Sequence, residues 1–322
     1  MQEMFLGIDY DMRVVDEEIR KTILADDPFV TEVAGHLLQA GGKRMRPALS
    51  LLGAKFCRYS LEEVLPLAVA LELIHVATLI HDDVIDDSLA RRGAPTVNAK
   101  WGKRIATNVG DYILAKSLHL ISTYEVKKPE IPQVFSDISS KMCEGEFRQI
   151  EDAFDTEQGA RDYFYRVKRK TAYLLTASVY LGAVACDGAR EVCLPLRRFG
   201  NNIGMAFQIT DDILDMVADR EELGKLTGED LCQGVITLPV IYAMQCSPQK
   251  ERLSELAGKF SKTDEEIQEA IEIVKECGAI DHAFTVVNKY LSKAKDELEA
   301  LPDIPARNNL LWIADFIGIR KY

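Results

Sequence analysis

The chain has 322 residues, of which 47% are hydrophobic, and this much apolar material can fill a sizeable core and excludes extended disorder over most of the length. Its 51 acidic and 39 basic residues give a formal net charge of −12, which argues against non-specific binding to nucleic acid. None of the seven cysteines forms a CxxC pair, so we expect neither a disulfide framework nor a zinc site and place most of them, reduced, in the core.

The N-terminal residues and the length of the apolar runs indicate whether the protein is secreted or spans a membrane. The segment MQEMFLGIDYDMRVV carries acidic residues and no apolar run, which argues against a signal peptide. Runs such as LLTASVYLGAVAC are too short to cross a bilayer. We therefore expect a soluble cytoplasmic protein.

Hydrophobic residues recur with the helical period in nearly every segment, as in residues 61–83, 163–185 and 265–301. Alternating strand patterns are nearly absent. Prolines and glycines mark the joints between segments, and no joint is long enough to be a domain linker. The sequence therefore predicts a single all-α domain over residues 1–322 with ten or more helices.

The first charged motif in chain order is GGKRMRP, which puts three cations, Lys43, Arg44 and Arg46, in a turn opened by two glycines. A solvated surface is the ordinary interpretation of one basic cluster. Guanidinium and ammonium groups are also natural partners of a diphosphate, so anion binding is the alternative.

The motif HDDVIDD, residues 81–87, ends an otherwise apolar helical pattern in four carboxylates. Asp82 and Asp86 are four residues apart, and like charges at that spacing repel each other on a helix. A bound cation would offset this repulsion, whereas the alternative is a solvated acidic helix end. His75 and His81 lie on the same pattern, where a histidine is usually structural, but His75 is two turns before Asp82 and could share its site.

Further basic residues follow at three places. Arg91 and Arg92 come shortly after the first acidic motif, Lys168, Arg169 and Lys170 precede an apolar helical segment, and Lys225 lies in the polar stretch 219–234. A long polar stretch beside a charged motif is often functional. In an acidic protein, the pairing of basic clusters with acidic motifs favours the binding of an anion.

The acidic pattern recurs at QITDDILD, residues 208–215, again after an apolar helical run. Both motifs read Asp-Asp-x-x-Asp, and this places Asp211, Asp212 and Asp215 at the C-terminal part of a helix, where the helix dipole disfavours anions. Carboxylates are hard ligands that suit Mg²⁺, which commonly binds one or two carboxylates, waters and a substrate phosphate. Two facing motifs would hold several Mg²⁺ ions with a diphosphate between them.

Together these motifs resemble the trans-isoprenyl (polyprenyl) diphosphate synthases, most of all those with medium and long products such as heptaprenyl and octaprenyl diphosphate synthases. The similarity covers nearly the whole chain and runs through GGKRMRP, ELIHVATLIHDDVIDDSLARRGAPT, GDYIL, KTAYLL, AFQITDDILD, GKLTGEDL and TLPVIYA in the family's order. It implies an isoprenoid synthase-type bundle of mostly antiparallel helices around a central cavity, usually as a homodimer.

The resemblance also implies roles for individual residues. Mg²⁺, three ions per active site, would be held on the allylic diphosphate by Asp82, Asp83, Asp86, Asp211, Asp212 and Asp215. The allylic diphosphate would also be bound by Arg91, Lys170 and Lys225, and isopentenyl diphosphate by Lys43, Arg46, His75 and Arg92. Thr171 and Gln208 would line the reacting centre, and Arg320 in the tail would close over the second substrate.

The implied reaction begins when the C–O bond of an allylic diphosphate breaks, because Mg²⁺, lysine and arginine neutralise the leaving charge. The double bond of isopentenyl diphosphate then attacks the allylic cation, and loss of a proton gives a longer allylic diphosphate. One residue departs from the family, since Val235 stands where a lysine usually precedes the sequence TLP. A missing cation there would slow ionisation or point to a partner subunit.

Small residues before the first motif bear on product length. Ala77 and Thr78 lie five and four residues before the first aspartate, where bulky aromatic residues stop chain growth in the family. Ile74 follows one turn further up, and no aromatic residue lies on this face. We therefore predict a product in the hexaprenyl to decaprenyl range, a precursor of quinone side chains, and expect Ala77→Phe to shorten it. Met142 and Phe147 could form the floor of the product channel, but we expect both to pack in the core.

Other functions remain open from the sequence alone. One alternative is that the chain is a catalytic or weakly active subunit of a hetero-oligomeric synthase, and Val235 is the only residue that supports it. A class I terpene cyclase or head-to-head condensing enzyme lacks the basic turn and the paired RRG, and a helical bundle that buffers Mg²⁺ leaves the basic turns unexplained. For the favoured function the partners are isopentenyl diphosphate and an allylic diphosphate, with transient membrane contact on product release and no nucleic acid.

Overall fold

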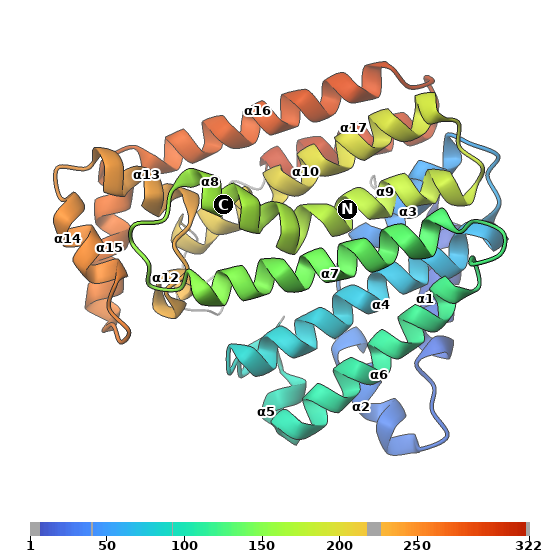
Figure 1. Ribbon diagram of the computed structural model, residues 1–322, viewed down its shortest axis with the longest axis horizontal. Coiled ribbons are helices and arrows are strands. Elements are labelled where there is room, and N and C mark those ends of the chain that lie inside the picture. The colour runs from blue at the N-terminus through green and yellow to red at the C-terminus, as the bar shows by residue number, and fades with distance from the viewer. Residues whose placement is uncertain (1–6, 40, 92, 218–226, 320–322) are drawn as a thin grey trace. The chain divides into compact units, whose positions relative to one another are not determined.

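The computed structural model of the protein describes residues 7–39, 41–91, 93–217 and 227–319. These ranges are mostly helical, which confirms the predicted all-α fold of ten or more helices (Figure 1). Their only strands are β1 (Ala90–Arg91) and β2 (Ala94–Pro95), which pair antiparallel as a short hairpin.

The chain forms two compact units. The first comprises Met1–Ser136, Ala177–Arg197 and Leu301–Leu310, and the second comprises Asp137–Thr176, Arg198–Ala300 and Leu311–Tyr322. Helices wholly within the first unit are α1 (Asp9–Thr22), α2 (Pro28–Gln39), α3 (Met45–Lys55), α4 (Leu61–Ile85), α5 (Val97–Trp101) and α6 (Lys103–Ser122). Within this unit α4 packs against α1, α3, α5 and α6, so it is the central helix. The expectation of a single domain stays a prediction.

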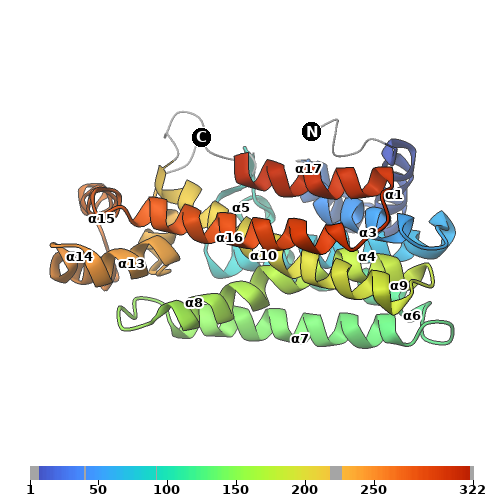
Figure 2. The same cartoon turned by 90° about the horizontal axis from the view of Figure 1, so that it is seen from above.

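The second unit contains one long helix and several short elements. It contains α8 (Ala160–Val167), the π-helix η2 (Lys168–Ala172), α12 (Glu229–Gln233), α13 (Leu238–Cys246), α14 (Lys250–Ala257), α15 (Asp264–Glu276) and α16 (Ala279–Glu299). Helices α13, α14 and α15 contact one another, and they are seen grouped in Figure 2. Four helices contribute residues to both units: α7 (Glu130–Glu151), α9 (Tyr173–Ala185), α10 (Arg190–Val217) and α17 (Pro305–Ile319).

Helix α4 begins at a strong N-cap, because the Ser60 side chain accepts a hydrogen bond from the Glu63 backbone and two glutamates occupy the first turn. By length and composition alone this helix could cross a membrane, but 67% of its most apolar window is buried inside the protein, as expected of a core helix. It ends at Ile85, and Asp87 follows with a left-handed φ of 51°.

Tyr124, in the turn that follows α6, reaches the backbone of α4 beside Pro66. In a regular helix the Leu67 N–H would bond to the Glu63 carbonyl, but here the Tyr124 hydroxyl lies between them. It donates to the Glu63 oxygen at 2.5 Å and accepts from the Leu67 N–H at 3.2 Å. Burial raises the pKa of Tyr124, so its hydroxyl stays protonated and can donate. This tyrosine therefore fastens the N-terminal part of α4 to α6.

Two smaller residues continue this contact at seven-residue intervals along α6. The Ser117 hydroxyl donates to the Ala70 carbonyl at 2.8 Å. Gly110 leaves room for His81, since a Cβ on this glycine would lie 2.3 Å from the imidazole Nε2. Helix α6 is therefore held closely along α4 up to the start of the first acidic motif.

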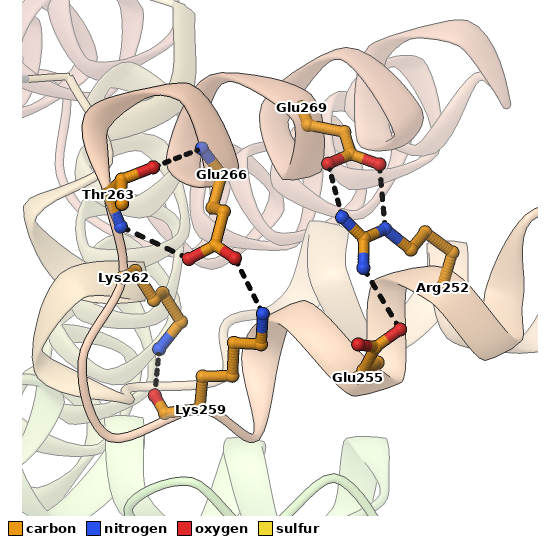
Figure 3. Close-up of polar contacts among 7 residues, drawn as sticks. All are labelled: Arg252, Glu255, Lys259, Lys262, Thr263, Glu266 and Glu269. Carbon is orange, nitrogen blue, oxygen red and sulfur yellow. Dashed lines mark hydrogen bonds and ion pairs between the residues drawn. The ribbon is translucent and has the colours of Figure 1, made fainter.

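The α14–α15 pair is fastened by charged side chains (Figure 3). Arg252 donates to both carboxylate oxygens of Glu269, at 2.8 and 2.7 Å, and Thr263 caps α15 in a reciprocal capping box with Glu266.

Gly228 packs closely against α15, since a Cβ built on it would lie 2.7 Å from an isoleucine methyl of that helix. Gly228 has a φ of +85°, which glycine tolerates readily, and α12 begins directly after it.

The cysteines differ from expectation. All seven are free thiols, which agrees with the predicted absence of a disulfide framework. Only Cys186 and Cys193 are buried, whereas Cys143, Cys232 and Cys246 are exposed, so the expectation that most of them lie in the core was wrong. A cysteine's apolar character does not fix its place on a helix, because the face it occupies depends on the neighbouring pattern.

We predict that Tyr124→Phe lowers the free energy of unfolding by about 1–2 kcal/mol, because two backbone groups of α4 lose the hydroxyl that joins them. Urea denaturation followed by circular dichroism measures the change. Tyr10→Phe is the matched control, since Tyr10 is 67% exposed. Equal stability of the two variants would contradict the role given to Tyr124.

Candidate active site

The first aspartate motif occupies the end of α4, and its three aspartates are not equivalent. Asp83 is buried, and its Oδ1 accepts bonds from Arg91 Nε at 2.8 Å and Nη2 at 2.7 Å. Arg91 lies on β1, and the hairpin that carries it turns at Gly93, which has a φ of 75°. Asp82 and Asp86 are partly exposed. The middle aspartate is thus held within the protein, and the outer two face outward.

The outer aspartates share a face of α4 with two other partly exposed residues. His75, Thr78, Asp82 and Asp86 are separated by three, four and four residues, so they line one side of the helix. The Thr78 hydroxyl donates to the His75 carbonyl at 2.9 Å. The structure therefore places the predicted His75 and Thr78 beside the first motif.

The other two residues predicted to set product length lie on a different face. Ile74 and Ala77 are buried, with exposed fractions of 3% and 1%. Their spacing places them on the stripe of α4 that carries Ala70 and His81, both of which contact α6. Thr78 is therefore the better placed of the predicted residues to meet a substrate on the aspartate side.

The three cations of the basic turn before α3 have different surroundings. Arg44 has a left-handed φ of 46° and is the N-cap residue of α3. Its guanidinium pairs with Asp16 at 3.0 Å and with the buried Glu72 at 2.9 Å. Lys43 and Arg46, the two predicted to bind isopentenyl diphosphate, lie on either side of Arg44 and are partly exposed. Arg44 therefore anchors the turn that presents its neighbours.

The second aspartate motif repeats the arrangement at the end of α10. Asp212 is 5% exposed, and it accepts hydrogen bonds from the Tyr163 hydroxyl at 2.5 Å and from Gln208 Nε2 at 2.8 Å. Asp211 and Asp215 are partly exposed. As in the first motif, the middle carboxylate is the one held most deeply inside the protein.

Asp215 also organises the chain that returns to the motif. Its carboxylate accepts the backbone N–H groups of Glu229 and Asp230, both at 3.2 Å, at the start of α12. Burial is the largest cause of a rise in the pKa of Asp215 to about 6, and these backbone bonds act against it. Burial, followed by the charge of Asp215, raises the pKa of Asp230 well above its usual range. Burial and the charge of neighbouring carboxylates therefore disfavour the ionised forms of both groups.

The predicted Lys170 and Thr171 lie in the π-helix η2, between α8 and α9. Short π turns inside helices are frequent at functional sites. Helix α7 approaches the turn closely, since a Cβ built on Gly145 would lie 2.9 Å from the backbone nitrogen of Lys170. Lys170 Nζ pairs with Glu146 of α7 at 2.7 Å. The wide turn and the glycine together fix the direction in which Lys170 points.

Helix α10 reaches the same π turn through another glycine. A Cβ on Gly204 would lie 2.6 Å from Ala172 Cα, so the two elements touch at backbone distance. One turn further along α10, Gln208 Oε1 accepts a hydrogen bond from the Thr171 hydroxyl at 2.6 Å. The two residues predicted to line the reacting centre are therefore joined to each other, and through Gln208 to Asp212.

Two buried polar residues of α8 escaped the sequence analysis. Tyr163 is fully buried, and Arg166 is 3% exposed. Arg166 donates to Gln158 Oε1 at 2.9 Å and to the Ile236 carbonyl at 2.7 Å, next to Val235. A tyrosine and an arginine three residues apart form an ordinary amphipathic pattern, so no sequence signal marked them.

Three of the predicted site residues are not described by the structure, and two further residues test the expectation of core packing. Arg92, Lys225 and Arg320 lie outside the described residues. Met142 is buried as predicted, but Phe147 is 73% exposed, so core packing was wrong for Phe147. The helical period places Phe147 on the outward face of α7, five residues from Met142 and therefore on the other side.

Comparisons with known proteins identify the family of the chain. The Polyprenyl synthetase family model matches residues 27–274. Heptaprenyl diphosphate synthase component 2 of Bacillus subtilis is 42% identical over 322 residues, which cover 100% of this chain and 91% of that protein. Heptaprenyl diphosphate synthase from Staphylococcus aureus has a similar structure, with a TM-score of 0.92, 36% identity, and coverage of 98% of this chain and 99% of that one.

A polyprenyl synthase from Caulobacter crescentus, in complex with calcium and isoprenyl diphosphate, matches with a TM-score of 0.93 and 32% identity over 100% of this chain and 98% of that one. The fold and the two aspartate-bearing helix ends thus define a prenyltransferase. The chain belongs to the polyprenyl synthetase family, and it makes a polyprenyl diphosphate.

We predict that Arg91→Ala lowers the free energy of unfolding by about 2–4 kcal/mol, because it leaves the carboxylate of Asp83 buried without its cation. Lys103→Ala breaks the nearby pair with Asp87, whose side chains are 57% and 68% exposed, and should cost less than about 0.5 kcal/mol. Thermal and urea unfolding of both variants measure the difference. Similar losses for the two would show that Asp83 does not depend on Arg91.

Proposed function

We propose that the protein is a Mg²⁺-dependent synthase that adds successive isopentenyl diphosphate units to an allylic diphosphate and releases a long all-trans polyprenyl diphosphate. The observation that carries this proposal is the shared build of the two helix ends, in which the outer aspartates are partly exposed and the middle one is held inside the protein. Fixed, accessible carboxylates suit a cation that also binds a diphosphate.

The donor set fits magnesium. The outer residues Asp82, Asp86, Asp211 and Asp215 offer only hard oxygen ligands. Among the residues that the structure describes, no three His, Cys, Asp or Glu side chains lie close enough to hold a metal ion by themselves. Mg²⁺ commonly completes its shell with waters and substrate phosphates, so such a site suits it. We propose three ions per active site, which neutralise charge on the leaving diphosphate.

The basic residues divide between the two substrates. Lys170 and Arg91 bind the allylic diphosphate, and their pairing with Glu146 and Asp83 holds both side chains extended beforehand. Isopentenyl diphosphate needs no metal and is bound by the cations of the basic turn, Lys43 and Arg46, together with His75. Because Arg44 anchors that turn, its neighbours need little reorganisation to bind an anion.

The reacting centre lies beside Thr171 and Gln208. Their oxygen atoms are fixed by the hydrogen bond between them and present the negative ends of neutral dipoles to the allylic carbon. Such fixed dipoles stabilise developing positive charge without reorganisation during the reaction. The released diphosphate then takes the proton that the new allylic product loses.

The product is expected to be long, in the hexaprenyl to decaprenyl range. The side of α4 that carries the first motif presents Thr78 rather than an aromatic residue, which leaves room for a growing chain. Similarity to heptaprenyl diphosphate synthases supports this length class. Such products are precursors of quinone side chains, and a chain this apolar leaves the enzyme at a membrane surface.

A second subunit is the alternative form of the same function. The Bacillus subtilis relative is named component 2 of its synthase, which supports a proposal that this chain also works with another component. Val235, where the family usually has a lysine, is the residue of this chain that favours it. A homodimer of this chain is the simpler assembly, and it is the one we propose first.

Elongation by the single chain tests the proposal. The purified protein is given Mg²⁺, farnesyl diphosphate and labelled isopentenyl diphosphate, and the products are separated by length. We expect a ladder that ends between hexaprenyl and decaprenyl diphosphate. Diphosphate binding without any elongation would instead support the partner-dependent form, and Val235→Lys would then be tested in the same assay.

We predict that Thr78→Phe shortens the main product by at least one isoprene unit with little loss of stability, because Thr78 is partly exposed on the aspartate side of α4. Ala77→Phe should shorten the product only at a cost of about 1–3 kcal/mol in stability, because Ala77 is 1% exposed against α6. Product chromatography and thermal unfolding of both variants measure these effects. An unchanged product length with Thr78→Phe would show that the growing chain does not pass this side of α4.

A further inference from the structure

Tyr163 is the largest fully buried side chain of α8, and its hydroxyl is directed at the second aspartate motif. The hydroxyl donates to Asp212 Oδ2 at 2.5 Å. A phenylalanine would fill the same space, so core packing alone does not explain the hydroxyl. Burial and then the charge of Asp212 raise the pKa of Tyr163 well above its usual range, so the hydroxyl keeps its proton and remains a donor.

The second oxygen of Asp212 is bound as well. Gln208 Nε2 donates to Oδ1 at 2.8 Å, and Gln208 Oε1 accepts from the Thr171 hydroxyl at 2.6 Å. The amide of Gln208 therefore has a defined orientation, with its nitrogen on the aspartate and its oxygen on the threonine. Four side chains from α8, α10 and the π turn form one continuous chain of hydrogen bonds.

Arg166 supports this chain from one turn along α8. Its guanidinium carbon lies 5.7 Å from the centre of the Tyr163 ring, and it donates hydrogen bonds to the neutral oxygens of Gln158 and Ile236. Within the described part of the protein it forms no direct ion pair. Burial raises the pKa of Asp212, and the nearby charge of Arg166 acts against that rise.

We propose that Tyr163 is a positioning residue for the second aspartate motif, which it serves by fixing the carboxylate of Asp212 and, through it, the amide of Gln208. The inference rests on the proposed function, because it gives Asp212 and Gln208 work at a metal-bound diphosphate. Partners of this kind hold the groups around a metal site in the correct orientation. The hydroxyl needs no contact with substrate to do this.

The test compares Tyr163→Phe with Tyr165→Phe, a control from the same helix that is 44% exposed and does not contact the motif. For Tyr163→Phe we expect the Mg²⁺ concentration that gives half the maximal rate to rise about tenfold, as is typical when an outer partner of a metal site is lost. At saturating Mg²⁺ the rate should recover to near that of the parent. Tyr165→Phe should leave the Mg²⁺ dependence unchanged.

A binding measurement that needs no turnover accompanies the assay. Calorimetric titration of Mg²⁺ into the protein with inorganic diphosphate should show the same weakening in Tyr163→Phe. In the variant Asp212→Asn the further change Tyr163→Phe should have little added effect, because the two residues act through one bond. Thermal unfolding separates this result from a general loss of stability, which raising Mg²⁺ would not repair.

The outcomes distinguish a failure of the positioning role of Tyr163 from a failure of the proposed function. Equal Mg²⁺ dependence of Tyr163→Phe and the parent overturns the positioning role, as does a loss of rate that saturating Mg²⁺ does not restore. If the parent protein makes no elongated product and the calorimetric weakening is still seen, the proposed function fails for the single chain while the role of Tyr163 stands.

Discussion

The concentration of carboxylates at the ends of two apolar helices is the constraint on which the rest of the site depends. Six aspartates stand where the helix dipole and mutual repulsion both work against negative charge. The protein meets this in the same way twice. Asp83 is held by Arg91, and Asp212 is held by Tyr163 and Gln208, so one carboxylate of each motif is satisfied internally. The outer aspartates are partly exposed, and this exposure is the basis on which we propose that they bind a cation.

Close contacts between helices also support the elements that carry these carboxylates. Along α4 the support comes from Gly110 and Ser117 of α6 and from Tyr124 just after it, which allow close approach or bond to the α4 backbone. In the second unit, glycines at 145 and 204 let two helices touch the π turn that carries Lys170. Rigid supports of this kind reduce the reorganisation needed when a charged substrate binds.

Much of this was readable from the sequence, and the reasons are physical. The helices follow from a repeated 3.6-residue apolar pattern, and the motifs follow from charges placed where a helix disfavours them. The roles of Tyr163 and Arg166 were not readable, because Tyr163 meets its partner Asp212 only through the fold, 49 residues away. The prediction that Phe147 packs in the core failed for a related reason. A residue type suggests a preference, whereas the neighbouring helix decides which face is covered.

The division between inner and outer aspartates is the central claim, and counting bound metal ions tests it most directly. Mn²⁺ can replace Mg²⁺ as a spectroscopic probe, and its binding in the presence of inorganic diphosphate can be counted by electron paramagnetic resonance. Asp211→Asn should lower the number of ions bound, whereas Asp212→Asn should keep the number and weaken the affinity. If Asp211→Asn binds as many ions as the parent and Asp212→Asn binds fewer, the division of roles described above is contradicted.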